Sequence, residues 1–377
     1  MSEINTSNFK KEHGDLAPDL VGVTELTSPY FFVPPSGTTG ERPEDCEPGT
    51  LRFNTDIGSL EVFRGKTIGW EQIQRRESQY LGGGTNSNTG TGVRGITAGG
   101  NTPSAKEEIE FITISTFGNS QDFGNLTAAS TGNAGSASNT RGIFDGQGNP
   151  ATNVISFITI ASKGDAQDFG DNSIGTIGYR ASLSNQIRTV SSGGNSPASG
   201  TGDTIDYITI AQKGDSVDFG NLSSTRDAGH AFASTTRGIF AGGASSPAIQ
   251  FVTIMTTGDA VDFGSLSIGT VAGHGCSNAT RGIMKFRGSS YVNTMEFVTI
   301  ATLGNSVDFG DATNNAGGAA AMASSTRAIY AGGYGSPSFK TEIGSVEIAT
   351  TGDAVTFGDL SYAADHVAGL SNGHGGL

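Results

Sequence analysis

The chain has 377 residues, 58 of them glycine, and a formal net charge of −14 at pH 7. An acidic chain without basic clusters is a poor candidate for binding nucleic acid or an anionic membrane surface, so we expect neither partner. No apolar run approaches the ~20 residues of a membrane-spanning helix, and the polar stretch from Met1 to Lys11 predicts that no secretory signal peptide is present.

Three segments precede the repetitive part of the chain. Residues 1–48 are polar or rich in turn residues and predict an extended N-terminal arm. Residues 49–80 alternate apolar and polar side chains between turns, which predicts a small β meander whose third strand starts at Trp70. Residues 81–93 are rich in Gly, Ser, Thr and Asn, as is typical of a flexible linker.

Residues 94–377 contain six repeats of about 47 residues. Each repeat resembles T-R-G-I-F-A-G-G, a variable gap, and then F-V-T-I-A-T-T-G-D-A-V-D-F-G-D-L. Its first landmark is an arginine: Arg94, Arg141, Arg188, Arg237, Arg281 and Arg327. Its second is a phenylalanine: Phe123, Phe169, Phe219, Phe263, Phe309 and Phe357. A period of this length, built from short apolar runs and turns, is typical of β-propeller blades.

Four short strands are predicted within a repeat, at residues 230–233, 238–241, 249–254 and 261–263 in the fourth one. The first repeat begins on its second strand at Arg94, and the chain ends with a segment that aligns with a first strand. We therefore expect the C-terminal strand to complete the first blade, which would give six blades and remove the open sheet edges.

The recurrent side chains are predicted to be structural. The landmark phenylalanines are expected to pack between adjacent blades. The third strand carries a second recurrent aromatic residue, replaced by Ser345 in the sixth repeat. The recurrent arginine and the aspartate before each landmark Phe (Thr356 in the sixth repeat) predict ion pairs within or between blades. A calcium-binding ring of these acids is the alternative, and the repeats lack the carboxylate density of a calcium loop.

A catalytic or metal site is not predicted. His230, His274 and His366 are aligned at one repeat position, where other repeats have alanine. A metal site is one interpretation and sequence drift is the favoured one. Cys46 and Cys276 are far apart and form no disulfide framework, which predicts folding in a reducing cytosol. We expect no enzymatic activity, no metal and no cofactor.

The gaps between strands two and three, and between strand four and the next strand one, vary most in length and sequence. In a four-stranded meander these connections lie on one face, so that face is expected to carry any binding site. The candidate receptor-binding side chains are Tyr291, Tyr334, Phe339 and Lys340. The alternative is that they are ordinary loop residues.

The order of strand, Gly-Gly, strand, hairpin and strand resembles kelch repeats, although the kelch Tyr and Trp are missing. The specific cassette also resembles kelch-like repeats in structural proteins of tailed bacteriophages, especially those of cyanobacteria. Residues 49–73, which read G-T-L-R-F-N-T-D-I-G-S-L-E-V-F at their start, are similar to a module near the start of phage fibre and other virion proteins.

This resemblance implies a virion structural protein of the fibre or appendage type, assembled in the host cytoplasm. Residues 1–80 would attach it, as a homo-oligomer, to other virion proteins, and the propeller would bind a host-surface glycan or protein. One alternative is a purely structural capsid, neck or tail decoration. The other is a polysaccharide depolymerase on a propeller scaffold, which would require clustered carboxylates at the variable loops.

Overall fold

The computed structural model describes residues 34–43, 45–56, 59–67, 69–72, 93–270, 273–287 and 292–377. The chain divides into two compact units, Met1–Arg76 and Glu77–Leu377. All described elements are strands except one short 3-10 helix, so the all-β prediction is confirmed. In the described part of the chain, no helix is long and apolar enough to cross a membrane.

Unit 1 contains the predicted meander of β2 (Leu51–Asn54), β3 (Ser59–Phe63) and β4 (Trp70–Gln72). A fourth strand, β1 (Ser36–Gly37), pairs in parallel with β2, and η1 (Thr39–Glu41) follows it. The sequence did not predict these two elements, which fall within the expected arm. Their position has an electrostatic reason, because the buried carboxylate of Glu61 forms ion pairs with Arg42 and Arg52.

The described strands of unit 2 include six antiparallel four-stranded sheets. Sheet 1 consists of β32 (Ala368–Ser371), β5 (Arg94–Ala98), β6 (Lys106–Thr113) and β7 (Gln121–Ser130). Sheet 2 consists of β8 (Ala134–Ala137), β9 (Arg141–Asp145), β10 (Val154–Thr159) and β11 (Gln167–Asp171). Sheet 3 consists of β12 (Ala181–Ser184), β13 (Arg188–Ser192), β16 (Thr204–Thr209) and β17 (Val217–Asn221).

The remaining sheets follow the same order of strands. Sheet 4 consists of β18 (His230–Ala233), β19 (Arg237–Ala241), β20 (Ala248–Thr253) and β21 (Val261–Ser265). Sheet 5 consists of β22 (His274–Ser277), β23 (Arg281–Lys285), β24 (Thr294–Thr299) and β25 (Val307–Asp311). Sheet 6 consists of β26 (Ala320–Ala323), β27 (Arg327–Ala331), β30 (Glu342–Glu347) and β31 (Val355–Asp359).

The burial of each strand reflects its place in the sheet. The second strands, such as β19, are buried at consecutive positions and so on both faces, because a neighbouring sheet covers each face. The fourth strands, such as β21, bury mainly the landmark phenylalanine and expose the two residues before it. The first strands are short and rich in small residues, which allows neighbouring sheets to approach closely there.

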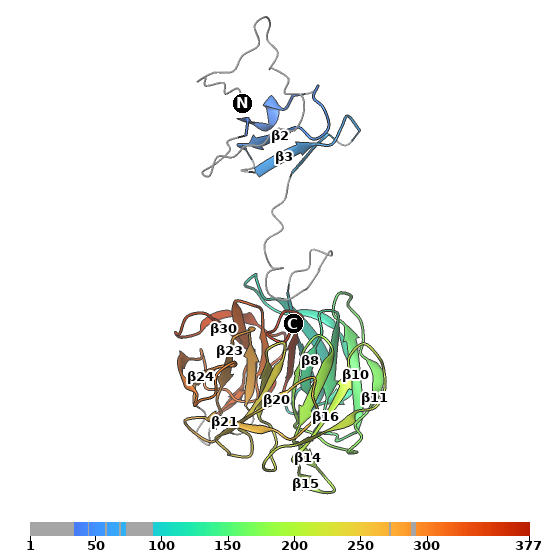
Figure 1. The fold of residues 1–377 in the computed structure, drawn as a ribbon, viewed down its shortest axis with the longest axis vertical. Coiled ribbons are helices and arrows are strands. Elements are labelled where there is room, and N and C mark those ends of the chain that lie inside the picture. The colour runs from blue at the N-terminus through green and yellow to red at the C-terminus, as the bar shows by residue number, and fades with distance from the viewer. Residues whose placement is uncertain are drawn as a thin grey trace, which may run out of the picture. The chain divides into compact units, whose positions relative to one another are not determined.

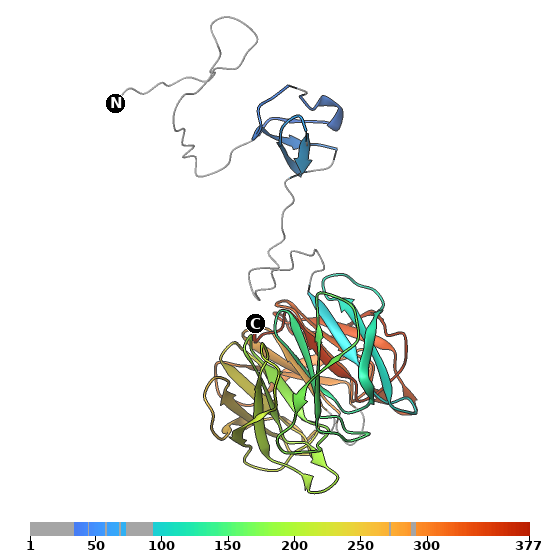
Figure 2. The same ribbon diagram turned by 90° about the vertical axis from the view of Figure 1, so that its right-hand side faces the viewer.

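Contacts between first strands link the sheets. Strand β8 contacts β12 and β32, β18 contacts β12 and β22, and β26 contacts β22 and β32. The C-terminal strand β32 pairs antiparallel with β5, as the repeat boundaries predict. Figures 1 and 2 show the sheets of unit 2 standing side by side. This architecture is compatible with a β-propeller.

The landmark phenylalanines are all buried. In sheets 1 to 5 each one meets the aromatic residue of strand three in a T-shaped pair, as for Phe123 and Phe111 at 6.2 Å between ring centroids. The core around this pair also contains Ile158 and Ile160 of sheet 2, which confirms packing between neighbouring sheets. Burying one such phenylalanine contributes about 1.5–3 kcal/mol.

The predicted pairing of the recurrent arginines with aspartates is wrong. Each arginine instead donates from Nη1 to a backbone carbonyl of the next sheet, for example Arg237 to Ile300 O at 2.8 Å. The other bonds run from Arg94 to Ile160, Arg141 to Ile210, Arg188 to Ile254, Arg281 to Ile348 and Arg327 to Ile114. The aspartates before the landmark phenylalanines are exposed, so the long arginine side chains satisfy an uncapped carbonyl instead.

The hairpin between strands three and four supplies a second link, which the sequence did not predict. Its Asp or Asn accepts a hydrogen bond from a backbone N–H of the preceding sheet, as when Asp259 Oδ1 accepts from Asn221 N at 2.9 Å. The glycine before it lies against the preceding fourth strand, and a Cβ on Gly220 would lie 2.4 Å from Gly258 O. Only glycine therefore fits at the Phe-Gly step of that strand.

Sheet 6 shows how the repeat tolerates the loss of its strand-three aromatic at Ser345. Phe117, from the hairpin of sheet 1, stacks on Phe357 at 5.1 Å. The guanidinium of Arg327 lies 4.8 Å from the Phe117 ring, in the place of the missing aromatic partner. The substitution is therefore compensated by a residue more than 200 positions away in the sequence.

Candidate functional site

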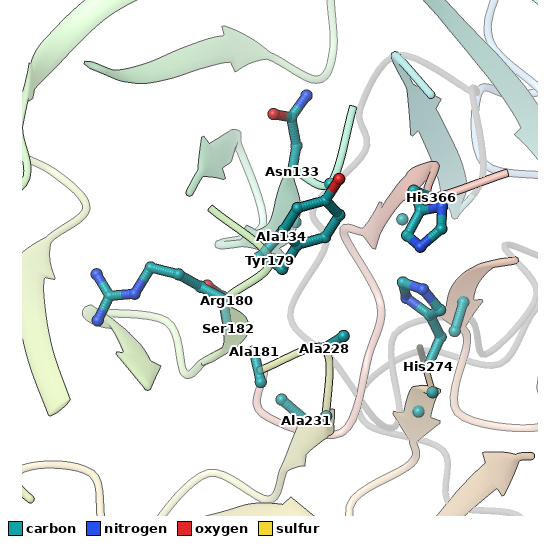
Figure 3. Close-up of a pocket in the computed structure, with 17 residues that line it drawn as sticks. Asn133, Ala134, Tyr179, Arg180, Ala181, Ser182, Ala228, Ala231, His274 and His366 are labelled. Atoms are coloured by element: carbon teal, nitrogen blue, oxygen red, sulfur yellow. The ribbon is translucent and has the colours of Figure 1, made fainter. Parts of the chain in front are cut away.

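A cavity lies where the first strands begin. We call this end of unit 2 the loop side, because the variable connections lie there, and the opposite end the turn side. The cavity, here the central pocket, encloses about 560 Å³, part of it open to solvent. Its lining is mostly Gly, Ala and Ser, together with Asn133, Tyr179, Arg180, His274 and His366. Figure 3 shows the rings of Tyr179, His274 and His366 directed towards one another.

The position two residues before each first strand shapes this pocket. Five of the six repeats have a left-handed backbone there, and Ala272 of the remaining one lies outside the described residues. The φ values are 72° at Gly132, 56° at Tyr179, 49° at Ala228, 69° at Gly318 and 53° at His366. Such a conformation disfavours non-glycine residues. Tyr179 and His366 are therefore strained at the backbone, and their large polar rings lie at the pocket.

Tyr179 and His366 form a perpendicular pair with ring centroids 5.5 Å apart. Tyr179 is held by glycines on two sides, since a Cβ on Gly132 or Gly148 would lie 2.6 Å from its ring. Burial, with smaller contributions from Asp365 and Asp227, raises the pKa of Tyr179, so the phenol remains a donor at neutral pH. Nδ1 of His366 lies 3.1 Å from Asp365 Oδ2, which fixes the imidazole.

The structure corrects the alignment of the histidines. His230 and His274 are the first residues of β18 and β22, whereas β32 begins at Ala368. His366 therefore occupies the left-handed position and is not equivalent to the other two. Burial and the nearby charges of His230, His366 and Lys285 lower the pKa of His274 to about 3, so it is neutral at physiological pH. Among the described residues, no cluster of metal-ligating side chains is present.

His230 lies behind the pocket wall, where a Cβ on Gly273 would be 2.2 Å from its Nε2. Burial lowers its pKa from 6.5 to about 4. The unfolded chain takes up this proton below pH 6.5 and the folded chain does not, so the free energy of unfolding falls as the pH drops from 6.5 to 4. The expected loss is about 3 kcal/mol.

Urea unfolding of the wild type and His230→Leu at half-unit pH steps from 7.5 to 4 measures this contribution. We expect the variant to show a flatter curve across that window, while both curves respond alike to the other titrating groups. Parallel curves would show that His230 does not titrate as its burial requires.

The wall beside Tyr179 is held by a buried ion network. Arg180 is inaccessible and lies 2.5 Å from Asp206 Oδ1 and 3.5 Å from Asp145 Oδ2. Its Nη2 also donates to Ser191 O at 2.9 Å. In Figure 3 the guanidinium is directed away from the pocket, so Arg180 positions the wall and its charge is not offered to a ligand.

Towards the turn side, the C-terminal segment crosses the ends of the first strands. His374 Nε2 donates to Ala137 O at 2.9 Å, and its Nδ1 accepts from Gly376 N at 3.1 Å. Gly375 N donates to Ser277 O at 2.8 Å. Burial lowers the pKa of His374 and outweighs the opposite effect of the bond to Ala137 O. Access to the central pocket is thus from the loop side.

The predicted recognition residues do not line this pocket. Tyr334 of β28 (Tyr334–Gly335) and Phe339 of β29 (Ser338–Phe339) pack against each other at 5.1 Å in a small hairpin. Lys340 Nζ donates to Ser338 Oγ at 3.2 Å. Tyr291 lies outside the described residues. The sequence signal that marks the pocket is a different one, namely a large residue at a repeat position otherwise filled by glycine or alanine.

Comparison with known proteins identifies a fold and no family. No protein-family model and no curated protein matches the chain. A solved structure of YjhT is similar, with a TM-score of 0.55 and 11% sequence identity over 65% of this chain and 88% of that one. At this identity the similarity concerns the fold alone.

Proposed function

We propose that residues 94–377 form a closed, six-bladed, kelch-like β-propeller that acts as a binding module without catalytic activity. Two links between the ends of this region support closure. Strand β32 pairs with β5, and Arg327 of sheet 6 donates to Ile114 O of sheet 1 at 2.9 Å. The same arginine contact joins each of the other five pairs of neighbouring sheets. Sheet 6 therefore contacts sheet 1 in the way that each sheet contacts the next.

The ligand proposed for the central pocket is a glycan of the host cell surface, and the protein is proposed to be a fibre or appendage component of a phage virion. The observation that carries the binding role is the pair Tyr179 and His366, held in strained backbone over a pocket of small residues. An aromatic ring packs against a sugar face, while the phenol, the imidazoles and the Asn133 side chain offer hydrogen-bonding groups.

The attachment role falls to residues 1–80, which would bind other virion proteins in a homo-oligomer. Val93 precedes β5 on the turn side, so the chain enters the propeller at the end opposite the pocket mouth. Many copies on one particle would bind by avidity, and a weak individual site is sufficient for adsorption.

The double variant Tyr179→Gly/His366→Gly tests the pocket without disturbing the backbone. Gly132 and Gly318 already occupy the equivalent left-handed position, so glycine relieves strain there. We expect ligand binding to fall at least ~30-fold, since two ring contacts of ~1 kcal/mol or more each are lost, with the unfolding temperature unchanged or raised. Ala228→Gly, at the same repeat position, is the matched control and is expected to bind normally.

Glycan-array binding and competition for phage adsorption by the full-length protein provide the measurements. A folded double variant that blocks adsorption as well as the wild type would exclude the central pocket as the receptor site. Failure of the wild type, tested as a multimer, to bind glycans or block adsorption would contradict the receptor role itself.

One observation favours the second candidate, a purely structural decoration protein. Sheets 3 to 6 each expose the first valine of the fourth strand, between 53% and 57% at Val217, Val261, Val307 and Val355. Leu303 and Met255 are exposed in the neighbouring hairpins. This row on the turn side would suit contact with another virion protein.

The third candidate, a depolymerase, requires clustered carboxylates, and no described residue lining the central pocket is Asp or Glu.

A further inference from the structure

A smaller cavity between sheets 3 and 4 contains a buried arginine without a counter-charge. Its lining includes Leu222, Arg226, His230, Phe240 and Gly242, and we call it the Arg226 cavity. Arg226 is only 3% exposed. Its Nη1 donates to Ala248 O at 2.9 Å, while its Nε and Nη2 are buried without a hydrogen-bond partner. No ion pair found among the described residues includes Arg226.

Arg180 shows what this arginine lacks. It is equally inaccessible, but two carboxylates, Asp145 and Asp206, neutralise its charge. A guanidinium does not deprotonate in a protein, so Arg226 stays charged even though burial lowers its pKa. An unpaired charge among Leu222 and Phe240 is strongly unfavourable unless an anion or an equivalent polar partner is bound.

The other polar groups around the cavity are compatible with an anion. His230 is neutral and has both ring nitrogens unpartnered. Thr270 has an unpartnered hydroxyl that lies beside Gly242, where a Cβ would be 2.1 Å from Thr270 Oγ1 and 3.4 Å from His230 Cδ2. The carboxylate of Asp227 also lines the cavity and opposes a bound anion; its Oδ2 accepts from Asn195 Nδ2 at 3.4 Å.

The Arg226 cavity encloses about 210 Å³, part of it open to solvent, which is less than half of the volume of the central pocket. A compact anion suits the two unpartnered guanidinium donors in this space. We propose that the Arg226 cavity binds one monatomic anion of the chloride class, held by Nε and Nη2 of Arg226. Ala228 and Gly229 line both this cavity and the central pocket, so the bound anion stabilises a shared wall.

Thermal unfolding of the full-length protein tests this site when sodium chloride replaces sodium gluconate at constant ionic strength. We expect the midpoint of unit 2 to rise by about 2 °C or more between ~1 and ~300 mM chloride. Arg226→Leu is expected to abolish this dependence. Arg188→Leu is the matched control, because it removes the same charge from an arginine that bonds Ile254 O and leaves the cavity intact.

Crystals of the wild type grown in bromide give an independent result if Arg226→Leu does not fold. An anomalous bromide peak within hydrogen-bonding distance of Arg226 Nε and Nη2 is expected. A wild-type midpoint that does not respond to chloride, or a cavity that holds only an ordered water molecule in bromide, overturns the proposal.

Discussion

Ending the chain after Asp365 is expected to abolish the cooperative unfolding of unit 2. This truncation removes β32, which alone among the first strands of the six described sheets comes from outside its own repeat, and leaves β5 without one of its hydrogen-bonded neighbours. It also removes the buried side chains of Val367 and Leu370, each worth about 1.5–3 kcal/mol. With the lost backbone pairing, the total exceeds ~5 kcal/mol, which is comparable to the whole stability of many domains.

The matched control is a chain that ends after Ser371. It keeps β32, including the Ser371 hydroxyl that donates to Ala323 O at 2.6 Å, and loses only the segment across the turn side. We expect this shorter truncation to cost about 1–3 kcal/mol, chiefly through the lost bond between Arg94 N and Asn372 Oδ1. Circular dichroism and guanidinium unfolding compare the two. If the chain that ends after Asp365 unfolds cooperatively, with a midpoint close to that of the full chain, the role assigned to β32 is contradicted.

Much of the fold could be predicted from the repeat itself. The strands predicted for residues 230–233 and 238–241 agree with β18 and β19 to within one residue, because Gly-Gly and Thr-Thr turns delimit apolar runs clearly. The parallel strand β1 could not be predicted, since two residues carry no periodicity. Its placement depends on Arg42 and Arg52 reaching the buried carboxylate of Glu61, which is a tertiary interaction.

The contacts between repeats were harder to predict than the strands within them. An arginine and an aspartate that recur together in the repeat indicate an ion pair. The guanidinium is nevertheless long enough to reach the next sheet, where it satisfies a backbone carbonyl, as for Arg237 and Ile300 O. The serines at the ends of alternate first strands illustrate the same limit. Ser184, Ser277 and Ser371 each bond to backbone groups of the preceding alanine-ended strand. Their alternation with alanine is visible in the sequence, but its meaning depends on which strands are neighbours.

The central pocket was missed because its signal is a departure from the repeat at one position. Tyr179 and His366 stand where Gly132 and Gly318 stand in other repeats, and only the left-handed backbone shows that these residues are equivalent. The predicted alignment of His366 with His230 and His274 is wrong by two residues, because the first strand of sheet 1 begins at Ala368. The sequence instead predicted binding by the aromatic loop residues Tyr334 and Phe339, which pack against each other.

Asp206→Asn is expected to destabilise unit 2 by about 1.5–3 kcal/mol, because it removes the nearer of the two carboxylates that pair with the buried guanidinium of Arg180 and leaves Asp145, 3.5 Å away. The substituted side chain keeps the volume of aspartate, so the loss comes from the charge and not from a cavity. Ser216 Oγ, which donates to Asp206 Oδ2 at 2.5 Å, retains an oxygen acceptor in the variant. Urea unfolding at pH 7.5 measures the effect, and Asp218→Asn, an exposed aspartate of the adjoining β17, is the control with the same change of charge.

The triple variant Arg180→Met/Asp145→Asn/Asp206→Leu separates charge compensation from simple packing. Removing all three charges should be milder than removing Arg180 alone, which would leave Asp145 and Asp206 buried without a cation. Because Arg180 follows the strained Tyr179 directly, Asp206→Asn is also expected to weaken binding of the proposed glycan ligand by loosening that wall of the pocket, whereas Asp218→Asn should leave binding unchanged. If the triple variant is less stable than Arg180→Met, or if Asp206→Asn unfolds like the wild type, charge compensation does not stabilise this wall of the pocket.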